Sequence, residues 1–245
     1  MKTNDIQFLY PKRAFESSAF LPEIEAFRNF GFIVENNPQE DAQLILYRGF
    51  ILWKQSDYPI DKRIWQGWKE YQATSLLSIY YPLIADICIP TFFVDELDQK
   101  VIKREMEKRK WECVFIKNDV KSLFCIDETA SVYPKHSLLE IKENLDKYPP
   151  FEGAKYAIRQ YVDADWTQED RYFVINDRIF HRSGIIPPIV QEAAKRLKPL
   201  GSHYYVIDAM PDFIVEVNPG ESSDRYGDNP PELFASWFKQ ALSSL

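Results

Sequence analysis

Residues 204–220 constrain the fold of this chain most strongly, because two short apolar runs flank the turn sequence Ala-Met-Pro-Asp. This pattern predicts a β-hairpin. Side chains alternate along a strand, so Glu216 and Asn218 point to one face of the second strand. If the loop has an odd number of residues, Asp208 pairs with Ile214 and shares that face. An even number places Asp208 on the opposite face.

The odd register would bring two carboxylates and one amide oxygen within about 7–8 Å of one another. Hard oxygen ligands of this kind suit Mg²⁺, which proteins commonly hold with one or two carboxylates together with substrate phosphates. Asp208, Glu216 and Asn218 are therefore candidate magnesium ligands. The alternative is a polar rim on an ordinary hairpin, and these residues alone do not decide between the two.

The composition is that of a globular protein. Of 245 residues, 45% are apolar and 27% are charged, which suits one large domain or two small ones. The formal net charge of −7 argues against a broad nucleic-acid-binding surface, which would be basic. Three cysteines without a Cys-x-x-Cys pair predict reduced thiols rather than disulfides or a zinc site. We see neither a signal peptide nor a membrane span in the sequence, so we predict a cytoplasmic protein.

The first fifty residues predict a small α/β unit, in which a strand at 6–10 is followed by a helix at 22–30 and strands at 32–35 and 44–47. Arg48 directly follows the last of these strands. Ligands tend to bind beyond the carboxyl ends of strands in open α/β sheets, so Arg48 is a candidate clamp for a phosphate or carboxylate. The alternative is an ordinary surface arginine.

The rest of the chain predicts a mixed α+β arrangement, with a boundary near residue 95 that separates an N-terminal α/β unit (1–95) from a second domain (96–245). The helices expected here span 61–81 (one or two helices), 98–110, 141–148, 187–197 and 229 onward, and the strands span 89–94, 114–117, 156–162, 171–175 and 178–181. The helix at 98–110 carries charges of both signs, so we interpret it as a solvated face rather than a nucleic-acid contact.

The second half also contains chemistry-bearing residues in an ordered series. The series runs through Lys117, Lys121, Ser122, Gln160, Tyr161, Val162, Asp163, Asp165, Arg171, Asp208, Glu216 and Asn218. A nucleotide held between two antiparallel sheets requires such an order. Lysines neutralise phosphates, a connecting strand meets the adenine edge, acids bind ribose hydroxyls, and carboxylates with an asparagine hold Mg²⁺.

Three segments carry a resemblance to a known superfamily. They are Phe115-Ile116-Lys117 with Lys121-Ser122, Asp170-Arg171-Tyr172-Phe173-Val174, and Glu216-Val217-Asn218-Pro219-Gly220. Together they resemble the ATP-grasp superfamily, and they are most similar to a compact branch of it named for one arginine and two lysines. Arg48, Lys117 and Lys121 would match those three residues. The resemblance covers roughly residues 44–245.

The resemblance implies an ATP-grasp-like fold and a role for each matching residue. Lys117, Lys121 and Ser122 would contact the phosphates of ATP, and Gln160, Tyr161 and Val162 would lie beside adenine, with Asp165 near the ribose. Arg171 would lie near the γ-phosphate, Arg48 would bind the acceptor carboxylate or a phosphate, and Arg182 would face the acceptor site. Asp208, Glu216 and Asn218 would hold Mg²⁺.

The implied activity is an ATP- and Mg²⁺-dependent carboxylate–amine ligase that acts through an acyl phosphate, with an amino acid or peptide as acceptor. The alternatives are an ATP-dependent phosphotransferase on the same nucleotide cradle and a nucleotide-binding module without catalysis. A nucleic-acid-modifying enzyme is a further alternative, suggested by the basic residues 103–110. The oligomeric state stays open, with a homodimer as one option.

Overall fold

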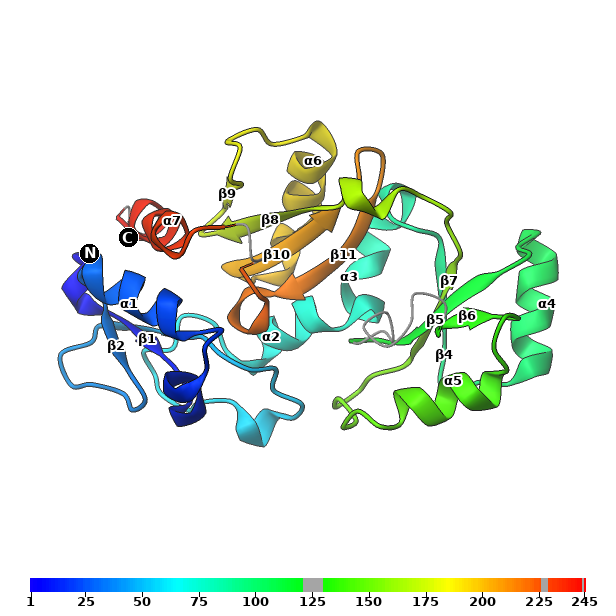
Figure 1. Ribbon diagram of the computed structural model, residues 1–245, viewed down its shortest axis with the longest axis horizontal. Helices are drawn as coiled ribbons and strands as arrows, with labels where there is room; N and C mark the ends of the chain where they lie inside the picture. Colours follow the sequence, from blue (N-terminus) through cyan, green and yellow to red (C-terminus); the bar gives the residue numbers. More distant parts are fainter. Residues whose placement is uncertain (121–129, 226–228, 244) are drawn as a thin grey trace.

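The computed structural model describes residues 1–120, 130–225, 229–243 and 245 (Figure 1). Its helices are α1 (Leu21–Asn29), α2 (Trp68–Ser75), α3 (Leu77–Ile84), α4 (Gln99–Arg109), α5 (Leu138–Leu145), α6 (Pro188–Leu197) and α7 (Pro231–Leu242). Its strands are β1 (Ile6–Leu9), β2 (Ile33–Glu35), β3 (Leu44–Tyr47), β4 (Thr91–Val94), β5 (Val114–Asn118), β6 (Val132–Tyr133), β7 (Tyr156–Gln160), β8 (Asp170–Ile175), β9 (Arg178–Phe180), β10 (Tyr204–Ala209) and β11 (Ile214–Pro219). None of the helices in these ranges has the length and apolarity needed to span a membrane.

The first sheet has the order β2-β1-β3 with parallel strands, as the strand–helix–strand pattern predicts. Its core is aromatic. The ring of Phe8 stacks on Phe27 of α1 with centroids 3.8 Å apart and meets Phe238 of α7 at 5.0 Å. Helix α7 therefore completes the core of the first unit, and Figure 1 shows α7 beside α1.

The second sheet is antiparallel in the order β4-β7-β5-β6. One face buries Ile116 and Ile158 against Ile102 of α4 and Ile141 of α5. Because side chains alternate, Lys117 of β5 points to the opposite face. The pairing of β4 with β7 starts this sheet at Thr91, so the boundary that we proposed near residue 95 falls after its first strand.

The third sheet is antiparallel in the order β11-β10-β8-β9. One face packs on α3 and α6, where Val174 and Ile207 are buried. The other face shares the core of the first unit, where Phe173 and Val206 meet the aromatic residues of α7. The third sheet therefore joins the first unit to the remainder of the molecule.

The hairpin of β10 and β11 corrects one prediction. Residues 210–213 form its loop, an even number, and Ala209 rather than Asp208 pairs with Ile214. A β-bulge follows, at which Val215 is the extra residue, and beyond it Asp208 pairs directly with Glu216. One inserted residue reverses which face every later side chain occupies. The bulge thus places Asp208 on the face of Glu216, which an even loop without a bulge would not do.

Candidate active site

The second and third sheets meet at an ion pair. Lys117 of β5 places its Nζ 2.6 Å from Oε2 of Glu216 on β11, and the Lys117 side chain is only 4% exposed. These residues are 99 positions apart in the chain. A buried amine in contact with a carboxylate concentrates charge at one place. This pair lies between the third sheet and the face of β5 that points away from α4 and α5.

Four further contacts extend the pair into a network on one face of the third sheet. Arg171 of β8 lies across from Asp208 and donates from Nε to Oδ1 at 2.7 Å and from Nη2 to Oδ2 at 2.8 Å. Asn218 donates from Nδ2 to Asp208 at 3.0 Å and to Glu216 at 2.9 Å. We call Lys117, Arg171, Asp208, Glu216 and Asn218 the charged cluster.

The two carboxyl groups of the charged cluster differ in electrostatic environment. Burial alone would raise the pKa of Glu216, but the charge of Lys117 and its hydrogen bond lower that pKa to about 2. Burial raises the pKa of Asp208, although Arg171 opposes the rise. Glu216 is therefore a firmly ionised carboxylate, while the charge of Asp208 depends on its bidentate pairing with Arg171.

Glu169 is a further acid beside the cluster that the sequence did not identify. Burial raises its pKa to about 7, and the negative charges of Asp208 and Glu216 add to the rise. It lies just before β8. The alternation of side chains along a strand, which predicted the shared face of Glu216 and Asn218, therefore does not apply to it. Its only sequence signal is its position just before Asp170-Arg171.

Arg48 does not have the role that we predicted. Its side chain is fully buried, and Nε and Nη2 donate to the two carboxylate oxygens of Glu23 on α1 at 2.8 and 2.9 Å. Nη1 donates to the carbonyls of Gly220, at 3.0 Å, and Ser223. Arg48 is thus neither a substrate clamp nor a surface arginine. It ties the first unit to the turn that follows β11.

That turn explains the glycine of the Asn-Pro-Gly segment. A Cβ atom on Gly220 would lie 2.4 Å from the ring of Tyr204, so no larger residue fits without displacing an aromatic side chain of the core. The next residue, Glu221, is 2% exposed and accepts hydrogen bonds from Gln66 and from the hydroxyl of Tyr58. Burial raises the pKa of Glu221 to about 7, although these hydrogen bonds oppose the rise.

The raised pKa of Glu221 predicts a pH-dependent stability. The folded protein holds this proton up to about pH 7, whereas an unfolded glutamate releases it near 4.5. The stabilisation is therefore complete below pH 4.5 and is lost as pH rises through 7, by roughly 3 kcal/mol. We expect the melting temperature to fall over this window, and Glu221→Gln to flatten the fall because glutamine resembles the protonated acid. Melting curves from pH 4.5 to 8.5 measure this.

Glu169 adds a change of the same sign, so the wild type alone does not isolate Glu221. The difference between the wild type and Glu221→Gln does. Glu232→Gln on the exposed side of α7 serves as the matched control. Parallel curves for the wild type and Glu221→Gln would refute a buried, protonated Glu221.

The residues predicted to lie beside adenine are at the crossing between the second and third sheets. Gln160 ends β7, and its backbone N–H donates to the carbonyl of Pro90 at 2.8 Å. The N–H of Tyr161 donates to the carbonyl of Cys113 at 3.2 Å, and Val162 continues the chain toward β8. Both of these amides are used within the protein, so other groups of this segment would have to meet an adenine ring.

The remaining predicted residues lie at other positions. Asp165 caps a short 3₁₀ turn, Trp166–Gln168, and accepts hydrogen bonds from Thr167. Arg182 is 43% exposed and approaches Asp170 to 3.7 Å, beside the buried His181. Lys121 and Ser122 fall outside the residues that the structure describes.

The donor atoms of the charged cluster fit a magnesium ion held jointly with phosphates. In the described part of the chain, no group of three or more His, Cys, Asp or Glu side chains is arranged to hold a metal by itself. Asp208 and Glu216, however, are direct cross-strand neighbours on one face, which supplies the one or two carboxylates that Mg²⁺ needs beside a nucleotide. The Asn218 amide would have to turn, since its Nδ2 faces both carboxylates.

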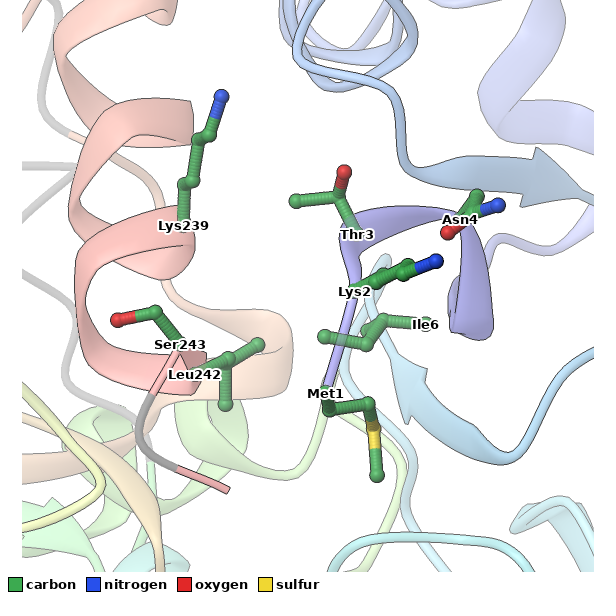
Figure 2. A pocket seen from close by; sticks show the side chains of 8 residues that line it. All are labelled: Met1, Lys2, Thr3, Asn4, Ile6, Lys239, Leu242 and Ser243. Carbon is green, nitrogen blue, oxygen red and sulfur yellow. The ribbon is translucent and has the colours of Figure 1, made fainter.

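A separate hollow lies between the first residues of the chain and the end of α7. Its volume is about 390 Å³, and it shares no residue with the charged cluster. Figure 2 shows the side chains that line it, which are Met1, Lys2, Thr3, Asn4, Ile6, Lys239, Leu242 and Ser243. Because the side chains that line it include no carboxylate, we place the candidate site at the charged cluster.

Comparison with known proteins identifies the fold. No protein-family model and no curated protein matches the chain. Among solved structures, the ATP-grasp ligase PsnB in complex with precursor peptide PsnA2 and AMPPNP superposes with a TM-score of 0.59 at 11% identity, covering 98% of each chain. The macrocyclase MdnC from Microcystis aeruginosa, bound with precursor peptide MdnA, gives 0.58 at 10% identity, covering 97% of this chain and 99% of MdnC.

A third match is the RimK-domain ATP-grasp protein from Sphaerobacter thermophilus. Its TM-score is 0.53 at 16% identity, over 96% of this chain and 99% of the other. All three superpositions span nearly the whole of both chains. The chain therefore has the ATP-grasp fold, and the fold predicted from the resemblance is confirmed.

Proposed function

We propose that this protein is an ATP- and Mg²⁺-dependent ligase that joins a carboxylate to an amine through an acyl phosphate. The observation that carries the proposal is the contact between Lys117 and Glu216. It joins two sheets and brings a lysine, which can bind phosphate, next to a carboxylate, which can bind a metal ion. The ATP-grasp fold supports it, because PsnB is an ATP-grasp ligase and was solved with AMPPNP.

Each residue of the charged cluster has a role in this proposal. Lys117 and Arg171, which contact Glu216 and Asp208, would offset the negative charge that develops on the transferring phosphoryl group, because such preorganised charges stabilise transition states strongly. Asp208 and Glu216 would hold Mg²⁺, with Asn218 completing the set once its amide turns. The ion, when bound, neutralises the phosphate oxygens.

The reaction needs positioning rather than a protein nucleophile. An oxygen of the substrate carboxylate attacks the γ-phosphorus of ATP, and ADP leaves. The amine then attacks the acyl carbon, inorganic phosphate leaves, and the amine loses a proton. The bond that forms is a C–N bond, and the free energy comes from the phosphoanhydride bond that is broken.

The acceptor in this proposal is a peptide or an amino acid. Two of the structurally similar proteins, PsnB and MdnC, were solved with precursor peptides, which favours a peptide. We further propose membership of the compact branch named for one arginine and two lysines. Arg48 is buried inside the protein, so among the described residues this proposed membership rests on Lys117. A cytoplasmic location is consistent with a reaction that uses ATP.

The test is ATP turnover with a defined pool of amino acids and peptides. We expect release of ADP and phosphate that depends on both Mg²⁺ and acceptor, together with a product whose mass equals that of the two substrates minus one water. Omission of either substrate is the control. A stable phosphorylated product would indicate a phosphotransferase, and tight nucleotide binding without turnover would indicate a binding module. Absence of ATP binding with and without Mg²⁺ would exclude all three.

A further inference from the structure

The carbonyl of Val215, at the bulge, accepts a short hydrogen bond from the neighbouring sheet and a longer one, at 4.0 Å, from Sγ of Cys88. Arg159 of β7 is 4% exposed, and its Nη2 donates to the carbonyl of Val215 at 2.6 Å. A bulge residue leaves the regular ladder, so its backbone groups need partners from elsewhere. Arg159 supplies such a partner from a different sheet.

The guanidinium of Arg159 is held in a fixed orientation. Its Nε donates to Oγ1 of Thr91 at 3.3 Å, and its Nη2 also lies 3.6 Å from Sγ of Cys88. Oγ1 of Thr91 in turn donates to the carbonyl of Ile89 at 2.8 Å. These partners are all neutral.

The same short segment also touches the bulge through its backbone. Cys88 forms a parallel bridge with Ile214, the residue before the bulge, and the carbonyl of Pro90 accepts the N–H of Gln160. Residues 88–91 therefore connect the edge of β11 to β7, and Arg159 closes this connection at Val215. The bulge is held from outside its own hairpin.

We propose that Arg159 is a positioning residue: its hydrogen bond to Val215 holds the bulge, and the bulge holds Glu216 opposite Asp208 and in reach of Lys117. Without the extra residue, the even loop of residues 210–213 sets Asp208 and Glu216 on opposite faces of the hairpin. Arg159 thus acts on the carboxylate pair through the backbone. The catalytic consequence rests on the proposed function, whereas the structural claim does not.

The experiment compares Arg159→Met, Arg159→Lys and the control Arg178→Met, whose side chain is exposed on β9. One readout is the Mg²⁺ concentration that half-saturates the enhancement of ADP binding. Loss of a residue that orients metal ligands typically weakens metal affinity about 10–100-fold, so we expect about 10-fold for methionine and a smaller change for lysine, which keeps one donor. ADP affinity without Mg²⁺ should change less than about 2-fold in all three variants.

The second readout is amide hydrogen exchange of residues 214–218. It should become faster in Arg159→Met, stay partly protected in Arg159→Lys, and remain unchanged in Arg178→Met. If exchange and Mg²⁺ dependence both match the wild type while the melting temperature drops, Arg159 is only a stabilising residue and the inference is wrong. If Arg159→Met does not fold, the lysine variant decides by the same two readouts.

The two readouts separate this inference from the proposed function. A wild-type protein that binds no nucleotide would end the proposed ligase activity. The exchange of residues 214–218 would still show whether Arg159 holds the bulge. Unchanged exchange in a folded Arg159→Met would overturn the inference even if the enzyme were active.

Discussion

Replacement of Glu216 by glutamine should lower ATP turnover by roughly 100-fold or more, the usual effect of removing one preorganised charged group from a catalytic site. The substitution keeps the volume and a hydrogen-bonding oxygen but removes the negative charge that Lys117 contacts at 2.6 Å. It also leaves Asp208 as the one charged member of the proposed metal pair. Steady-state ADP release at saturating ATP, measured across a Mg²⁺ titration, gives the size of the effect.

Glu232→Gln is the matched control for this experiment, because Glu232 is exposed at the start of α7. It should leave turnover and Mg²⁺ dependence unchanged. Melting curves must show that Glu216→Gln remains folded, since Lys117 loses its partner in a buried setting. A folded Glu216→Gln protein with wild-type turnover would remove the charged cluster from the mechanism.

Arg48→Met should destabilise the protein by about 3–5 kcal/mol, which is typical when one partner of a buried ion pair is removed. Glu23, 2% exposed, would keep a charge without its guanidinium, and the carbonyls of Gly220 and Ser223 would lose their donor. For a chain of this length the melting temperature should fall by roughly 10 °C. Denaturant titration at pH 7 measures the change in the free energy of unfolding.

The double variant Arg48→Met/Glu23→Leu should be more stable than Arg48→Met, because the buried Glu23 carboxylate is then no longer left without Arg48, and this gain should exceed the loss of the longer 3.9 Å contact between Glu23 and Arg225. Arg28→Met is the control. Its side chain is 48% exposed, lies 3.9 Å from Glu35 and donates to the carbonyl of Val34 at 3.0 Å, so the change should stay within about 1 kcal/mol. If Arg48→Met kept its stability but lost turnover, a substrate-binding role for Arg48 would have to be reinstated.

Local pattern was sufficient to locate most elements of the fold. The predicted strand at 44–47 and helix at 187–197 are present, as β3 and α6, with ends that agree within one residue. The apolar face of α6, with Val190 and Ala193 buried, follows from helical spacing alone. The meeting of Lys117 and Glu216 followed from the order of parts in the resemblance rather than from any local signal.

What the sequence could not supply depends on contacts between distant segments. An odd or even number of loop residues predicts the face of Asp208 only if both strands are regular. The β-bulge at Val215 breaks that regularity, and its carbonyl is bonded to Arg159, 56 positions away. The burial of Arg48 likewise needs Glu23 and the turn after β11, which come together only in the folded chain. Glu169 could be identified only from the folded structure, because its raised pKa results from burial and from the nearby charges of Asp208 and Glu216.

The packing of α7 against α1 has a consequence for biosynthesis. Phe8 and Phe27 emerge from the ribosome well before Phe234 and Phe238, which seal them from water. Until α7 has emerged, a nascent chain therefore carries an unsealed aromatic surface, which favours association with other hydrophobic segments or with chaperones. The packing of α7 on α1 covers this aromatic surface and so lowers the tendency of the new chain to aggregate.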